Sequence, residues 1–174
     1  MELKRSRYIW VMRDALYLDM VRSQFDAALD MLEECLRKCP PAQWHAKVAK
    51  YEFWLVAYHT LYCTDLYTAK DEAAWCTHPR FHPAGKSDVT DEYPSREFSK
   101  RELLAYLKLV RERLHASLQA ETPRSLAGPC GFSWVPVTRA ELPLYSMRHV
   151  QHHTGQLGAV LRRAKVKTKW AKAG

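Results

Sequence analysis

Residues 142–166 read LPLYSMRHVQHHTGQLGAVLRRAKV, and this stretch decides the fold. Its apolar and histidine positions recur three and four residues apart, which places them on one face of an α-helix. The inward-facing positions are Leu142, Tyr145, His149, His153, Gln156, Leu157 and Val160. A candidate capping box, Thr138 to Glu141, precedes them, and Pro143 favours a start near Leu142, where a first-turn proline is tolerated. The pattern predicts a helix over about residues 142–166.

Three more stretches share this helical period, and no convincing alternating strand appears. They cover about residues 15–37, 46–69 and 100–120. Pro40 and Pro41 end the first, because proline lacks an amide donor and disfavours helical backbone before it. Ser99 and Glu102 form a capping-box pattern that opens the third. Residues 8–11 (YIWV) are too apolar for a free tail and should pack, as a helical extension or on a neighbouring subunit.

The connections between these helices are uneven. The chain has 174 residues, a length that fits one domain. A short segment joins the first two helices, whereas roughly thirty residues, 70–99, separate the second from the third. Such a crossover lets the third helix run parallel to the second. Residues 121–138 form the last connection, and loops of this length are often functional. We therefore expect an all-α helical bundle.

The net charge of +8 is a local property of the C-terminal end. Residues 142–174 contain seven Lys and Arg and no acidic residue, whereas the preceding 141 residues carry 20 basic against 19 acidic residues. We interpret the basic end as a solvated helix end with a loose tail. No nucleic-acid recognition motif interleaves with this charge, so binding to nucleic acid is disfavoured.

The five cysteines indicate a reducing compartment. Their number is odd, no CxxC is present, and neither a signal peptide nor an apolar run of about 20 residues is found. We therefore expect a cytoplasmic protein with no membrane span. Cys35 and Cys39 lie one helical turn apart and could meet a metal or each other, but buried small apolar side chains are the favoured interpretation.

Three histidines on predicted inward faces indicate a metal site. His149 and His153 are four residues apart, so two imidazoles can bind one ion, whereas His152 is rotated by about 100°. His59 lies on the apolar face of the second predicted helix. Two partly exposed histidines and a satisfied core histidine are the simpler alternatives. Three imidazoles would leave coordination positions open, as in catalytic metal sites.

At these residues the sequence resembles the DinB-like (DinB/YfiT-like, damage-inducible) family of metal-binding four-helix bundles, over nearly the whole chain. The family typically has a histidine, three residues, and then His-Arg-Gly-Gln. Here His149, His153, Gly155 and Gln156 match that motif, while Thr154 replaces the usual arginine. Position 154 is not a ligand, so the departure leaves the metal site intact.

The resemblance implies a four-helix bundle with up-down-down-up topology and a long crossover between helices 2 and 3. It implies residues 1–166 as the bundle, with 167–174 as a basic C-terminal tail. It also implies a divalent metal, zinc or nickel, bound by His59, His149 and His153, together with a homodimer and a role in stress response. Some similar proteins are S-transferases or isomerases that use low-molecular-weight thiols, and one branch resembles metal-dependent hydrolases.

We therefore expect a metal-dependent enzyme, a thiol S-transferase type or a hydrolase, acting on a small-molecule substrate. The alternative is a non-catalytic, metal-stabilised bundle that acts by dimerisation or partner binding. Gln156 could hydrogen-bond a ligand imidazole or the substrate. Tyr58, Tyr62 and Tyr145 could border a substrate pocket, although plain core packing is also consistent with the pattern.

No residue stands out as a catalytic base. Glu52 shares a face with His59 but lies two turns away, and Asp65 points elsewhere on the helix. Cys63 follows His59 by four residues and could reach the metal, or it could be a packed thiol. The second HxxxH, over residues 78–82, lies among prolines and predicts a loop, which would shape a substrate pocket if it folded over the metal end.

Overall fold

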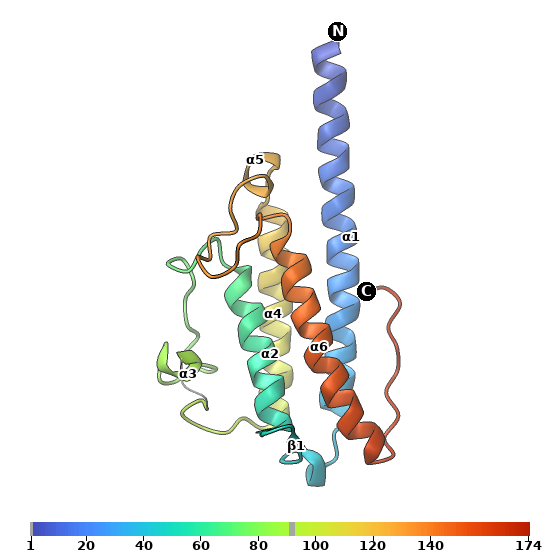
Figure 1. The fold of residues 1–174 in the computed structure, drawn as a ribbon, viewed down its shortest axis with the longest axis vertical. Coiled ribbons are helices and arrows are strands. Elements are labelled where there is room, and N and C mark those ends of the chain that lie inside the picture. The colour runs from blue at the N-terminus through green and yellow to red at the C-terminus, as the bar shows by residue number, and fades with distance from the viewer. Residues whose placement is uncertain (1, 91–92) are drawn as a thin grey trace.

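The computed structural model describes the backbone of residues 2–90 and 93–174, and the side chains of residues 15–88 and 93–174. Within these residues four long helices form a bundle: α1 (Glu2–Lys38), α2 (Phe53–Thr68), α4 (Lys100–Ala120) and α6 (Leu142–Arg163). α1 and α2 lie diagonally, each packed against both α4 and α6. α2 and α4 run parallel to each other and opposite to α1 and α6 (Figure 1). The all-α, up-down-down-up prediction is therefore confirmed.

The long connections each contain a short helix, α3 (Ser87–Thr90) in the crossover and α5 (Pro123–Leu126) before α6. α2 packs against α4 and α6, and the two connections cover more of its surface (Figure 1). Its first six residues, 53–58, are therefore all buried, and this part of the helix is apolar on every side. Among the described residues, no helix is long and apolar enough to cross a membrane.

α4 begins and ends where the sequence predicts, at Lys100 and Ala120. The Ser99 side chain accepts from the Glu102 amide, and the Glu102 carboxylate accepts from the Ser99 amide at 2.9 Å. The Ser99 hydroxyl also donates to this carboxylate at 2.7 Å, and this bond, the bond from the Ser99 amide and the bond from Arg96 lower the pKa of Glu102 to about 2. The Lys100 ammonium donates to the Cys39 carbonyl at 2.5 Å, so the start of α4 is tied to the end of α1.

The predicted start of the second helix is wrong. A small antiparallel hairpin, β1 (Lys47–Val48) and β2 (Tyr51–Glu52), precedes α2, and Ala49 between the strands has φ 54°. The apolar residues Val48 and Tyr51 are three apart, a spacing that a short hairpin also permits. Helical periodicity over so few residues therefore could not distinguish a helix from a hairpin.

The last helix starts at Leu142, as predicted, but ends at Arg163 rather than near residue 166. Lys165 has φ 62°, and the Val166 amide donates to the Leu161 carbonyl, which closes the helix. The capping-box bonds between Thr138 and Glu141 do form, but in the turn before the helix. At the other end of the chain α1 already begins at Glu2, so residues 8–11 extend the first helix; their side chains lie outside the described residues.

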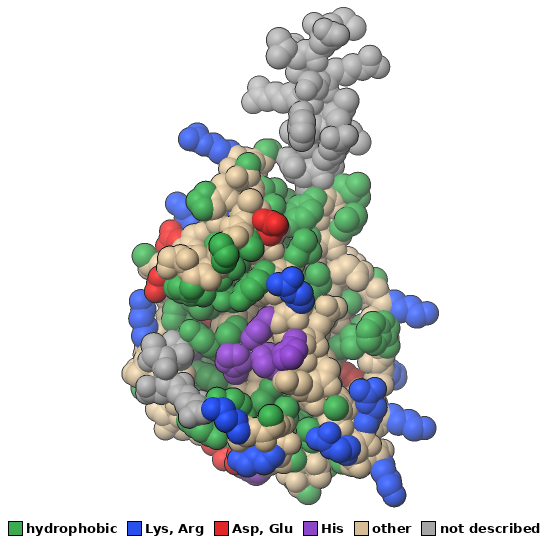
Figure 2. Space-filling model, viewed as in Figure 1, with side chains coloured by type: hydrophobic (Ala, Val, Ile, Leu, Met, Phe, Trp, Pro, Cys, Tyr) green, Lys and Arg blue, Asp and Glu red, His purple; other side chains and the backbone are tan. Residues whose placement is uncertain are grey.

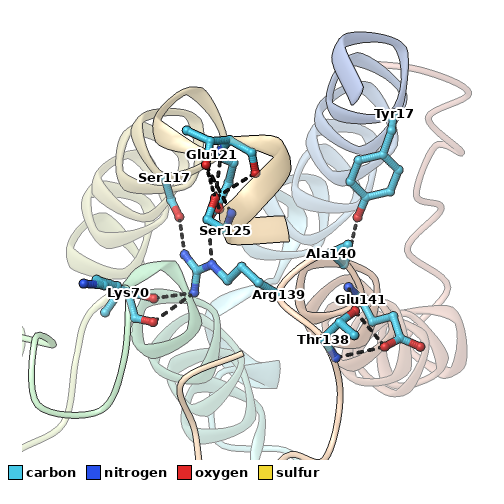
Figure 3. A network of polar contacts seen from close by, with 11 residues as sticks. Tyr17, Lys70, Ser117, Glu121, Ser125, Thr138, Arg139, Ala140 and Glu141 are labelled. Carbon is cyan, nitrogen blue, oxygen red and sulfur yellow. Dashed lines mark hydrogen bonds and ion pairs between the residues drawn. The ribbon is translucent and has the colours of Figure 1, made fainter. Parts of the chain in front are cut away.

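Arg139 fixes the start of α6 (Figure 3). Its Nε donates to Glu121 Oε1 at 2.6 Å and its Nη1 to the Ala69 carbonyl at 2.7 Å. Glu121 and Ala69 are the C-caps of α4 and α2, whose carbonyl ends favour a cation. The Tyr17 hydroxyl donates to the Ala140 carbonyl. One buried guanidinium and one tyrosine therefore set α6 in register with the other three helices.

The C-terminal residues follow α1 instead of forming a loose tail (Figure 1). Gly174 N donates to the Ser23 carbonyl at 3.1 Å, and Lys38 Nζ donates to the Lys167 carbonyl at 2.9 Å. Most side chains of this segment are exposed, so the solvated part of the expectation agrees with the structure. The attachment could not be predicted, because it uses mainly backbone groups.

Candidate metal centre

α2 and α6 bring three histidines together on one face of the bundle. His149 Nε2 lies 3.2 Å from His59 Nε2 and 3.1 Å from His153 Nε2. One nitrogen from each ring lies within 4.8 Å of the others. His59 is exposed, and His149 and His153 are half-buried. Figure 2 shows histidine side chains gathered among hydrophobic ones on this face.

The surroundings of these imidazoles lower their pKa values and so favour the neutral form. Burial, and then the neighbouring His153, lowers the pKa of His59 to about 4. Burial and the other histidines lower the pKa of His149 to about 3, and burial also lowers the pKa of His153. A neutral imidazole keeps a lone pair, which is the form that binds a metal. The cluster is therefore ready to act as a set of nitrogen donors.

The hydrogen bonds around the cluster fit metal binding. His153 Nδ1 lies 2.9 Å from Gln156 Oε1, and the amide oxygen accepts the Nδ1–H, which leaves Nε2 as the free donor atom. The Gln156 amide nitrogen lies 3.2 Å from His152 Nε2, so His152 lies outside the cluster. His149 Nδ1 is buried with no hydrogen-bond partner among the described residues. Imidazole nitrogens of this kind suit zinc, nickel, copper or iron.

Cys63 lies beside the histidines, one turn after His59. Its sulfur is 3.7 Å from His59 Nε2. Burial raises the pKa of this thiol to about 12, so without a metal it stays protonated. Its sulfur is not among the ligand atoms that lie within 4.8 Å of one another, which all come from the three histidines. Cys63 therefore borders the cluster.

Two of the candidate substrate residues, Tyr145 and Tyr62, each lie one helical turn from a histidine of the cluster. Tyr145 lies one turn before His149 and is half-buried, with the Arg148 guanidinium 5.6 Å from its ring centroid. Tyr62 lies one turn after His59, and its ring packs edge-on against Trp75.

Tyr58 is not brought to the histidines. Its side chain is 2% exposed, its hydroxyl donates to the Phe81 carbonyl at 2.9 Å, and its ring stacks on Phe98. Its position on the helix explains this placement, because the residue before His59 points about 100° away from it.

The two carboxylates considered as bases lie elsewhere. Glu52 accepts hydrogen bonds from Trp54 and pairs with His45. Asp65 is fully buried and accepts two hydrogen bonds from Arg113, at 2.8 and 2.9 Å. Among the described residues, the three-histidine group contains no carboxylate.

A buried hydrogen-bond network that the sequence did not predict joins the crossover loop, α4 and α2. His82 is 2% exposed, its Nε2 lies 2.9 Å from the Tyr106 hydroxyl, and that hydroxyl donates to Asp65. Residues 78–82 form no regular helix, as predicted, and the loop packs onto α2 and α4. The prolines around His82 removed any periodic signal, and only the tertiary contact reveals this histidine as a core residue.

Comparison with known proteins agrees with this architecture. The family model described as DinB superfamily matches residues 24–157, which include all three histidines of the cluster. No curated protein and no solved structure matches the chain. The matched region covers more than half of the sequence and contains most of the bundle. The chain therefore belongs to the DinB superfamily.

Proposed function

We propose that this protein binds one divalent metal through His59, His149 and His153 and acts as a metal-dependent enzyme on a small molecule. The convergence of three neutral imidazole nitrogens on an open face carries the proposal. Three protein ligands leave room for a further ligand, which is typical of catalytic sites. Zinc or nickel is the proposed metal, since both accept imidazole.

The bound metal would act as a Lewis acid toward an oxygen or sulfur ligand. The protein's own residues prepare that position. The Gln156 amide oxygen accepts a hydrogen bond from His153 Nδ1–H and so orients Nε2. Tyr145, Tyr62 and Gln156 are the proposed contacts to the substrate. Tyr58 has its hydroxyl engaged in the core and serves as a support.

A thiol S-transferase type fits this site better than a hydrolase. Hydrolysis benefits from a carboxylate base near the attacking water. Among the described residues none lies in the histidine group, since Asp65 is paired with Arg113 and Glu52 with His45. A low-molecular-weight thiol as cosubstrate needs no such base if the metal holds it as thiolate.

We also propose a cytoplasmic location. All five cysteines are free, which supports a reducing compartment.

We propose a homodimer as well. Leu16 and Met20 on α1 are 62% and 57% exposed, and burying them against a second copy would remove apolar surface from water. This supports a homodimer, and light scattering on the purified protein would measure it.

Metal analysis of untagged protein tests the proposal. Wild type and His152→Ala should each hold about one metal per chain, whereas the double variant His149→Ala, His153→Ala should hold almost none. His152 is the matched control, because it is an exposed histidine on the same helix. Retention of metal by the double variant would defeat the assignment.

Activity separates the enzyme from the non-catalytic alternative. Two assays should be run before and after treatment with a chelator. Thiol transfer is measured as the loss of glutathione or cysteine in the presence of an aryl halide, and hydrolysis as the release of nitrophenol from an ester. We expect chelator-sensitive thiol transfer. Metal binding without either chelator-sensitive activity would favour a metal-stabilised bundle that acts by partner binding.

A further inference from the structure

A groove on the other side of α6 lies between α1 and the C-terminal segment. Its volume is about 500 Å³, a size typical of sites for small organic ligands. Residues Ala28, Met31 and Cys35 of α1 form one wall, and Thr168, Lys169 and Trp170 form another. The wall on α6 is a stripe at helical spacing: Gln151, Thr154, Gly155, Gly158 and Arg162. None of the three clustered histidines lines it.

The groove has an apolar floor. Ala28 and Cys35 are each 2% exposed, and burial raises the pKa of Cys35 to about 11, so its thiol stays neutral. A Cβ added at Gly155 or Gly158 would meet nothing within 4 Å, so open space borders α6 at both positions. The stripe from Gln151 to Arg162 is about 16 Å long at helical rise, which suits an elongated ligand.

One end of the groove is cationic. Arg162 and Lys169 line it, and neither side chain makes a hydrogen bond or ion pair within the part of the chain that the structure describes. The lining contains no acidic residue. Glu34 lies nearby but is already paired with Lys38 at 2.8 Å and with the Lys169 amide at 3.3 Å.

The other end carries an unsatisfied polar group. Thr154 is 5% exposed and lines the groove, and its hydroxyl oxygen is buried with no hydrogen-bond partner among the described residues. This oxygen is already shielded from solvent, so a hydrocarbon chain lying over it would remove no hydrogen bond to water.

The C-terminal segment is held in place as the outer wall. The Lys172 carbonyl accepts from Gln24 Nε2 at 3.3 Å and the Lys167 carbonyl from Lys38 Nζ at 2.9 Å. Trp170 lies between these two anchors and is 75% exposed. An apolar ligand body beneath the segment would give this indole a partner.

We infer that this groove binds an elongated organic monoanion, a medium-chain carboxylate, with its head group at Arg162 and Lys169 and its apolar body along Gly158 and Gly155. Charge complementarity selects the anion, because two unpaired cations face a lining without acids. The apolar floor selects a hydrocarbon body over a small inorganic anion. The site is separate from the histidine cluster and does not depend on the proposed enzyme activity.

Calorimetric titration with decanoate tests this inference. We expect saturable binding of about one molecule per chain. Decyltrimethylammonium, which has the same chain and the opposite charge, should not bind. Arg162→Glu should weaken decanoate binding at least about tenfold, whereas the matched control Arg163→Glu, its exposed neighbour outside this lining, should change it less than about twofold.

Filling the groove gives a second, steric test. Gly158→Leu should abolish decanoate binding while the thermal unfolding midpoint stays the same or rises, because leucine favours a helix more than glycine does. The double variant His149→Ala, His153→Ala should bind decanoate like wild type, which separates this groove from the metal centre. Loss of decanoate binding in the double variant would place the ligand at the histidines and overturn the inference.

Three further results would overturn it. They are equal binding of decanoate and decyltrimethylammonium, wild-type binding by Gly158→Leu, and no saturation by decanoate up to about 1 mM.

Discussion

Replacing Gln156 with leucine is predicted to weaken metal binding without disturbing the fold. The Gln156 amide oxygen accepts the hydrogen bond from His153 Nδ1 at 2.9 Å, and leucine has a similar size but no acceptor. The His153 ring would then lose the contact that fixes its tautomer and orientation. Gln156 is half-buried on α6, so the substitution leaves no polar group in the core.

The size of the effect follows from one lost orienting contact at one of the three proposed ligands. Outer partners of metal-binding histidines contribute about 10–100-fold to metal affinity. Gln156 is partly exposed, so water can replace part of the bond, and we expect the lower end of that range. The dissociation constant for zinc should rise about tenfold, which corresponds to about 1.4 kcal/mol.

Competition with a chromophoric zinc chelator measures this change. Gln156→Glu keeps an acceptor oxygen and should restore most of the affinity. Gln156 also contacts His152, so His152→Ala is the control and should bind zinc like wild type. Wild-type affinity in Gln156→Leu, or an equal loss in His152→Ala, would refute the reasoning.

Three other perturbations test the cluster and the bundle separately. The metal-free protein should lose stability as the pH falls from about 6.5 toward 4, because the lowered pKa values of His59 and His149 let the unfolded chain bind more protons; urea unfolding across this pH range measures it. Arg139→Ala should reduce the free energy of unfolding by about 3–5 kcal/mol, because it leaves the buried Glu121 carboxylate without its cation; denaturant unfolding measures the loss. Ser99→Ala should cost about 1 kcal/mol through loss of the helix cap, visible in thermal unfolding.

Each of these has a clear contrary outcome. A urea midpoint of the metal-free protein that does not change between pH 7 and 4 would contradict the histidine assignment. Arg139→Lys is the control for charge and should recover only part of the loss, since lysine cannot match the several bonds of the guanidinium. A loss from Ser99→Ala as large as that from Arg139→Ala would show that the cap has a tertiary role that its exposed position does not suggest.

Local signals predicted most of the bundle. α4 was predicted to the residue because a capping box opens it, and the double proline after α1 marks that helix end. The hairpin before α2 was missed because its bonds connect residues across a turn, including Phe53 N to the Ala46 carbonyl. The path of residues 167–174 was also missed, since their backbone contacts with α1 leave no pattern in the side chains.

Helical spacing was enough to predict which histidines form the candidate site, but not how the neighbouring side chains pack. His149 and His153 share a face by spacing alone. His59 was added because the sequence predicts an inward face for it, whereas the structure leaves its side chain exposed beside the other two. Helix register could not decide between a pocket and core packing for Tyr58, because it does not show which neighbour α2 meets there; the structure places this side chain in the core. His82 gave no periodic signal, and only its contact with Tyr106 shows its place.

X-ray absorption at the zinc edge of the zinc-loaded protein tests the central claim most directly. Three imidazoles with an open position predict nitrogen and oxygen scatterers at about 2.0–2.1 Å, the imidazole pattern of His59, His149 and His153, and no sulfur. We expect the His149→Ala, His153→Ala variant, treated with zinc in the same way, to lack this imidazole pattern. A sulfur scatterer at about 2.3 Å, which only a thiolate such as Cys63 could supply, would contradict the account.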